Sequence, residues 1–288
     1  MKHLANRAAN FESTVIKRTV FFVSDQTGIT AETMGHSLMI QFDGMEFRQL
    51  TVPFISTVDK AVEAVRRIDR VAAEEGIRPI VFSTLVQEDV RNIVRGSAGF
   101  FLDFFDPFLG PLEHELKTQS SHMAGRTHRM ADTHDYAKRI DATNFALAND
   151  DGSVLRDYER ADIILIGVSR SGKTPTCLYL AMQYGIFAAN YPLTEEDFES
   201  RKLPHALESY AAKLFGLTIR PERLQQIRQE RRPDSRYSSA SQVAFEVRAA
   251  ESLYERNSIP VIDATECSIE EIASRILDRT GIERRLRP

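Results

Sequence analysis

The chain has 288 residues, of which 42% are hydrophobic and 27% are charged, and its formal net charge at pH 7 is −4. These values are typical of a globular protein with one large or two ordinary domains, and the acidic balance excludes a surface built throughout to neutralise nucleic-acid phosphates. The two cysteines lie far apart and have no Cys-x-x-Cys partner, so neither a disulfide framework nor a zinc site is indicated.

The first residues of the chain are mixed polar and charged, without an apolar signal region. We expect residues 1–17 to form a flexible tail, because chain ends fray unless something ties them down. No apolar run approaches the roughly 18 residues that a membrane span needs. The sequence therefore predicts a cytoplasmic protein that binds neither membranes nor nucleic acid.

From residue 19 onward, short β-branched or aromatic runs alternate with longer amphipathic stretches, a pattern typical of repeated β-α units. The first half predicts strands at 19–24, 47–54, 80–83 and 100–105. It predicts helices from a turn at 25–31 to about residue 41, at 58–75 and at 87–95. The polar stretch 107–139 contains two prolines and several histidines, and it predicts the connection between two domains. We assign 18–145 to an N-terminal α/β domain with this connector.

A second β-α series predicts strands at 161–166, 188–191, 217–219 and 259–263, and helices at 174–184, 221–231, 242–256 and 269–279. The predicted fold class is therefore α/β: an N-terminal α/β domain followed by a P-loop kinase-like α/β domain over 146–288.

The second domain is called kinase-like because of one motif. The pattern G-x-x-x-x-G-K-[ST] is matched at every fixed position by eight predicted nucleotide-binding residues, Gly167, Val168, Ser169, Arg170, Ser171, Gly172, Lys173 and Thr174. In such a loop the backbone N–H groups face phosphate oxygens, and the following helix adds the positive end of its dipole. Lys173 is predicted to be catalytic at the phosphates, and the Thr174 hydroxyl is placed to ligate magnesium.

Two further residues are candidates for the same site. Arg170 is predicted to be catalytic, because a guanidinium within the loop could stabilise charge on a transferred phosphoryl group. It could equally be a solvent-facing loop side chain. Asp263 ends an apolar strand and could support the metal, although acidic residues also end strands simply as turn formers.

A dense basic stretch lies between residues 220 and 236. It contains Arg220, Arg223, Arg228, Arg231, Arg232 and Arg236. Such a stretch could cover phosphates like a lid or dock an acidic partner. The alternative is an exposed helix whose charge is balanced by its glutamates.

Several runs resemble those of the bacterial phosphoenolpyruvate synthase regulatory proteins. They include SDQTGITAE at 24–32, DDG at 150–152, ADIILIGVSRSGKTPT at 161–176, AANYPL at 188–193 and FGLTI at 215–219. The resemblance spans about residues 19–276. It implies a bifunctional serine/threonine kinase and phosphorylase with phosphoenolpyruvate synthase as its protein substrate. ADP would be the phosphoryl donor to a threonine, inorganic phosphate would reverse the modification with release of pyrophosphate, and magnesium is expected.

Three alternatives stay open on the sequence. A sister family regulates pyruvate, phosphate dikinase, but the Gly172 form of the loop favours the synthase branch. A P-loop small-metabolite kinase would also fit, but the predicted N-terminal α/β domain of this chain argues against it. A GTPase-like switch ranks last, because no Asn-Lys-x-Asp segment occurs in the chain. The sequence leaves open a homodimer and the identity of the general base.

Overall fold

The computed structural model describes residues 16–121, 133–150, 155–200 and 202–286. It divides the chain into two compact units, Met1–Arg129 and Met130–Pro288, which are described separately. Residues 1–15 of the predicted tail lie outside the described residues, and Ile16 and Lys17 already belong to the first strand. Within the described residues, no helix is both long and apolar enough to cross a membrane.

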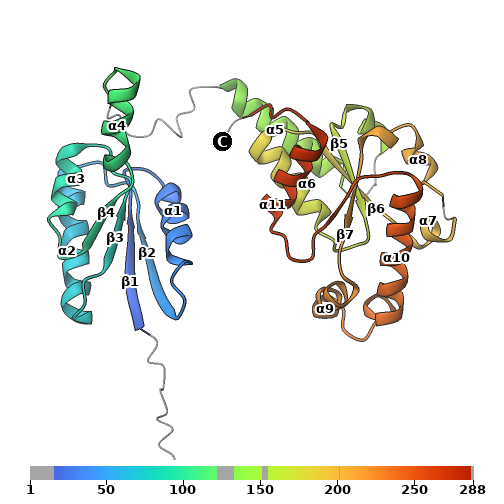
Figure 1. The fold of residues 1–288 in the computed structure, drawn as a ribbon, viewed down its shortest axis with the longest axis horizontal. Helices are drawn as coiled ribbons and strands as arrows, with labels where there is room; N and C mark the ends of the chain where they lie inside the picture. Colours follow the sequence, from blue (N-terminus) through green and yellow to red (C-terminus); the bar gives the residue numbers. More distant parts are fainter. Residues whose placement is uncertain (1–15, 122–132, 151–154, 201, 287–288) are drawn as a thin grey trace, which may run out of the picture. The chain divides into compact units, whose positions relative to one another are not determined.

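The first unit is a parallel four-stranded sheet with helices on both faces (Figure 1). Its elements are β1 (Ile16–Val23), α1 (Ile29–Met39), β2 (Met45–Val52), α2 (Val58–Glu75), β3 (Ile80–Ser83), α3 (Glu88–Arg95), β4 (Phe100–Asp103) and α4 (Asp106–Leu116). The strand order is β2-β1-β3-β4. Phe21 and Val23 face α2 and α3, whereas Val20 and Phe22 face α1. Successive side chains along β1 therefore pack alternately into two separate hydrophobic cores, one on each face of the sheet.

The ends of α2 show how local sequence sets an element. The Thr57 side chain accepts a hydrogen bond from the Lys60 amide at the start, and Gly76 ends the helix with φ 65°. Between them the buried positions recur at helical spacing, at Ala61, Ala64, Ile68 and Val71. A cap, an apolar stripe and a left-handed glycine together define the helix that the sequence predicts.

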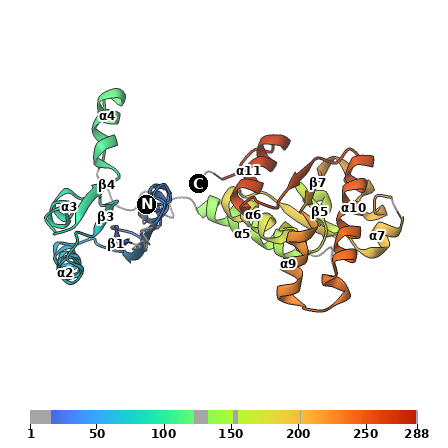
Figure 2. The same cartoon turned by 60° about the horizontal axis from the view of Figure 1, so that its bottom comes forward.

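The second unit repeats this architecture with a different set of helices (Figure 2). Its strands are β5 (Ile163–Gly167), β6 (Ala188–Pro192), β7 (Leu214–Thr218) and β8 (Val261–Asp263), all parallel in the order β6-β5-β7-β8. Its helices are α5 (Thr133–Ala148), α6 (Lys173–Tyr184), α7 (Glu195–Ser200), α8 (His205–Glu208), α9 (Pro221–Arg231), α10 (Ala240–Arg256) and α11 (Ile269–Thr280). Short 3-10 turns are η2 (Leu155–Arg160), η3 (Ala211–Lys213) and η4 (Arg236–Ser238).

The two faces of the second sheet are covered by different helices. Ile163 and Leu165 pack with α5, α6 and α11, while Ile164 and Ile166 pack with α9 and α10. From β5 the chain first crosses to β6 on one side and later to β7 on the other. In open parallel sheets ligands bind at the carboxyl ends of strands where the winding reverses in this way, here beyond β5 and β7.

The two units share one further detail. The helix after the first strand begins in each case behind a left-handed glycine, Gly28 with φ 88° and Gly172 with φ 93°. The spacing from the last strand residue, Val23 or Gly167, is the same in both units. The residue after the glycine differs, because Lys173 begins α6 whereas Ile29 begins α1.

The prediction of an α/β fold is confirmed, but the predicted connector at 107–139 is wrong in part, because it contains α4 and the start of α5. The first turn of α4 tolerates Pro107, whereas Pro111 lies inside the helix, where proline is normally costly. The boundary predicted at residues 145 and 146 also differs from the observed division. Ala142 and Ala146 of α5 pack in the core shared with α6 and α11, so α5 lies in the second unit.

Candidate functional site

The 167–174 loop connects β5 to α6, as the sequence predicts. Gly167 is required at its start, since a Cβ atom there would lie 2.6 Å from the Leu217 carbonyl oxygen of the neighbouring strand. Arg170 and Gly172 both have left-handed backbones, with φ 75° and 93°. A Cβ atom at Gly172 would meet no protein atom closer than Ile269 Cδ1 at 3.9 Å. The left-handed backbone of Gly172 therefore favours glycine, while its surroundings leave room for a side chain.

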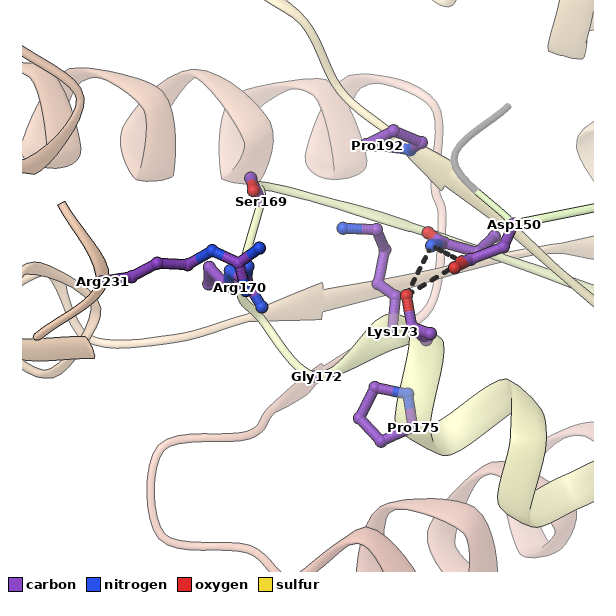
Figure 3. Close-up of a pocket in the computed structure, with 10 residues that line it drawn as sticks. Asp150, Ser169, Arg170, Gly172, Lys173, Pro175, Pro192 and Arg231 are labelled. Carbon is purple, nitrogen blue, oxygen red and sulfur yellow. Dashed lines mark hydrogen bonds between the residues drawn. The ribbon is translucent and has the colours of Figure 1, made fainter. Parts of the chain in front are cut away.

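A cavity of about 530 Å³ opens over this loop. It is lined by Asp150, Ser169, Arg170, Gly172, Lys173, Thr174, Pro175, Asn190, Pro192 and Arg231. Figure 3 shows Arg170 and Arg231 on one side of the cavity, Asp150 on the other, and the Lys173 side chain between them. Five of the eight predicted nucleotide-binding residues therefore line one cavity. The other three, Gly167, Val168 and Ser171, are buried and do not line it.

Lys173 is the central cation of the cavity. Its residue is only 4% exposed, and its Nζ atom donates hydrogen bonds to the carbonyl oxygens of Gly167 at 2.9 Å and Val168 at 2.8 Å. These bonds hold the ammonium group against the loop that the sequence predicts to bind phosphate. A point charge with several donors, held in place, suits contact with phosphate oxygens.

The Thr174 hydroxyl belongs to a hydrogen-bonded group of three side chains. It donates to Asp150 Oδ1 at 2.8 Å, and Asn190 Nδ2 donates both to Asp150 Oδ1 at 2.5 Å and to Thr174 Oγ1 at 3.1 Å. Asp150 follows α5 and Asn190 lies on β6, so the group joins segments far apart in the chain. A carboxylate and a hydroxyl are oxygen ligands of the kind that Mg²⁺ prefers, so these residues fit the expected metal.

The structure brings Asp150 to Thr174 and leaves the predicted metal residue Asp263 elsewhere. Asp263 is exposed at the end of β8 and does not line the cavity. Its Oδ1 accepts hydrogen bonds from the amide of Thr265 at 2.9 Å and from the Thr265 hydroxyl. This is the arrangement of a turn-forming aspartate, the alternative that the sequence had left open. The signal for Asp150 in the sequence was its place in the DDG run at 150–152, one of the runs that carry the family resemblance.

The basic stretch at 220–236 does not behave as one surface. Arg231, at the end of α9, lines the cavity, whereas Arg228 on the same helix is completely buried. Arg220 pairs with Glu266, and Arg236 pairs with Glu195 at 3.1 Å, both on the exposed surface. Within this stretch only Arg231 therefore adds charge to the cavity, since Arg228 is in the core and Arg220, Arg223, Arg232 and Arg236 are exposed without lining it.

A buried tyrosine fixes the strands beneath the loop. The hydroxyl group of Tyr254 on α10 lies 3.2 Å from the carbonyl oxygens of both Ile166 and Leu217, at the ends of β5 and β7. Burial raises the pKa of Tyr254, so its hydroxyl remains a hydrogen-bond donor. A Cβ atom at Gly216 would lie 3.0 Å from the same ring, and one at Gly167 would lie 3.2 Å from its hydroxyl oxygen, so both contacts are tight. The position of the loop thus depends on a residue that follows it by a long stretch of chain.

Comparisons with known proteins agree over nearly the whole chain. The model of the kinase/pyrophosphorylase family matches residues 20–277. A protein of Stutzerimonas stutzeri is 55% identical over 272 residues, covering 94% of this chain and 100% of the relative. Relatives from Pseudomonas putida and Pseudomonas aeruginosa are each 54% identical, covering 94% of this chain and 100% and 99% of the relatives. All three are provisionally named phosphoenolpyruvate synthase regulatory proteins.

Proposed function

Since the chain belongs to the kinase/pyrophosphorylase family, we propose that it is a cytoplasmic enzyme that phosphorylates phosphoenolpyruvate synthase on a threonine. In the forward direction the threonine hydroxyl attacks the β-phosphorus of ADP, its proton is released, and AMP leaves. In the reverse direction inorganic phosphate attacks the phosphothreonine, the threonine is restored, and pyrophosphate leaves. The first step inactivates the synthase and the second reactivates it.

The observation that carries this proposal is the cavity over the 167–174 loop. Its volume of about 530 Å³ is within the usual range of about 300–1,000 Å³ for small-molecule sites. Three cations, Arg170, Lys173 and Arg231, line it together with the loop backbone. This lining supports binding of a polyphosphate, and among the residues that the structure describes no lining side chain distinguishes two phosphates from three.

In this proposal Lys173 contacts the phosphoryl group during transfer, and Arg170 and Arg231 stabilise the charge that develops on its oxygens. The loop backbone binds the remaining phosphate oxygens through its N–H groups. Thr174 and Asp150, oriented by Asn190, would hold a magnesium ion. When bound, magnesium would neutralise charge on the phosphates. Catalysis by these residues is mainly positioning and electrostatic stabilisation.

The names of the relatives favour the synthase as partner over pyruvate, phosphate dikinase. A small-metabolite kinase is disfavoured by the first unit, which has its own two hydrophobic clusters and makes the chain larger than such a reaction requires. The first unit is more simply explained as part of the recognition of a protein substrate.

The test is to incubate the purified protein with ADP and with phosphoenolpyruvate synthase whose catalytic histidine has been phosphorylated, and then to measure the mass of the synthase. We expect one added phosphoryl group on a threonine with ADP, and none with the Lys173→Ala variant. Parallel reactions with ATP and with pyruvate, phosphate dikinase test the donor and the substrate. A synthase left unmodified with ADP would overturn the proposal.

A further inference from the structure

Arg228 is a buried charge placed directly against the loop. It lies on α9 within the basic stretch, yet it is 0% exposed. Its Nη2 atom donates to Glu246 Oε2 at 2.7 Å and to the carbonyl oxygen of Ser169 at 3.1 Å, and its Nη1 atom donates to the Tyr237 carbonyl oxygen at 3.1 Å. An arginine buried only for stability could be replaced by apolar residues, since burying an ion pair gains little. Its contact with the loop suggests another role.

The second partner of Ser169 is the tyrosine that stacks on this arginine. The Arg228 guanidinium lies 4.2 Å from the centre of the Tyr237 ring, and the Tyr237 hydroxyl is 3.0 Å from Ser169 Oγ. The carbonyl and the hydroxyl of Ser169 are therefore both bonded to the Arg228–Tyr237 pair. The loop is fixed at this residue from the side of α9, η4 and α10.

The bond to the Ser169 carbonyl determines where the next amide points. In a trans peptide the C=O and the following N–H are directed to opposite sides. With the Ser169 oxygen directed to Arg228, the Arg170 N–H is directed away from the buried guanidinium, at a position where both residues line the cavity. Arg170 itself has φ 75°, a conformation that non-glycine residues keep only when their surroundings enforce it.

We infer that Arg228 is a positioning residue, which holds the peptide between Ser169 and Arg170 in the orientation that presents the Arg170 amide to phosphate. The inference rests on the proposed phosphate-binding function of the loop. Glu246 balances the buried charge of Arg228, and Tyr237 provides the stacking surface that fixes the guanidinium plane. Arg228 acts through the backbone of the loop, without touching the ligand.

The variants are chosen to separate this role from stability. Arg228→Met removes the donor but leaves Glu246 as an unpaired buried charge, so we pair it with Arg228→Met/Glu246→Met, which removes both charges and can pack as an apolar pair. Tyr237→Phe keeps the ring and removes only the bond to the Ser169 hydroxyl. Leu253→Ala, a core change on α10 away from the cavity lining, is the matched control for destabilisation.

Calorimetry should show ADP and inorganic phosphate binding about 10- to 100-fold more weakly to both Arg228 variants. This is the factor expected when the hydrogen bond from the Arg170 amide to a charged phosphate is lost. The Tyr237→Phe variant should lose less of this affinity. The Leu253→Ala variant should bind ADP and phosphate as the wild type does at temperatures where it is folded. The KM for ADP should rise in the double variant even where its Tm equals that of the wild type.

A second readout needs no ligand. The ¹³Cα chemical shift of Arg170 reports its backbone dihedral angles, and we expect it to move in both Arg228 variants but not in Leu253→Ala. Wild-type affinities together with an unchanged Arg170 shift in the double variant would overturn the inference. If the wild-type protein binds neither ADP nor phosphate, the proposed function fails, and a changed Arg170 shift still supports the role of Arg228 in the backbone.

Discussion

Substituting Gly167 by alanine tests whether the site depends on the close approach of β5 and β7. The new Cβ atom would lie 2.6 Å from the Leu217 carbonyl oxygen, 3.1 Å from Ser171 Oγ and 3.2 Å from the Tyr254 hydroxyl oxygen. The first contact is with backbone, which cannot turn aside as a flexible side chain can. The strand end, and the loop that follows it, must therefore shift.

Overpacking of a well-packed core typically costs about 1–3 kcal/mol. For a unit of this size each kcal/mol lowers the Tm by roughly 2–4 °C, so a cost near 2 kcal/mol lowers it by about 4–8 °C. Scanning calorimetry measures this change, and titration with ADP measures the accompanying loss of affinity. We expect the affinity to fall by about tenfold or more, because the loop amides are displaced together with Gly167.

Gly281→Ala is the control. Gly281 ends α11 with φ 67° and has no atom within 4 Å of the position of a Cβ, so alanine there costs only backbone strain of about 1–2 kcal/mol. This variant should melt at a lower temperature and bind ADP as the wild type does. Gly167→Ala protein with wild-type Tm and ADP affinity would refute the reasoning from the contact with Leu217.

Three further predictions concern the chemistry. Lys173→Ala should slow both phosphorylation and phosphorolysis by about 100-fold or more, because both directions use one loop; loss of only one activity, assayed by pyrophosphate release, would indicate two sites. Asp150→Asn should raise the magnesium concentration for half-maximal activity by about tenfold, while unchanged metal dependence would exclude Asp150 from the metal site. Inorganic phosphate should compete with ADP in initial-rate measurements, and a purely noncompetitive pattern would contradict a shared site.

Most of the fold could be predicted because hydrophobic period and local caps agree along much of the chain. The predicted bounds 58–75, 80–83 and 221–231 are those observed for α2, β3 and α9. The failures occur where a local rule is overridden by tertiary packing. The region of α4 was predicted to be a linker because it contains two prolines. The start of α5 was assigned to the same linker, because its apolar residues are small and give only a weak helical pattern next to several histidines.

The candidate site was predictable only where its residues are consecutive. The 167–174 loop is a local motif, so its residues could be identified from spacing alone. Asp150, Asn190 and Arg231 reach the cavity from three other segments, and their contribution depends on strand order, which the sequence did not specify. The basic stretch shows the same limit, because composition could not distinguish Arg228, which is buried, from Arg231, which lines the cavity.

The dependence of the loop on Arg228 and Tyr254 has a consequence for the order in which the protein is made. During synthesis the four strands of the first unit are complete before any residue of β5 emerges, and domains generally fold as units from the N-terminus. The loop at 167–174 leaves the ribosome long before Tyr254, which bonds to the strand ends beneath it. A nascent chain that stops short of α10 should therefore contain the complete motif and still fail to bind ADP.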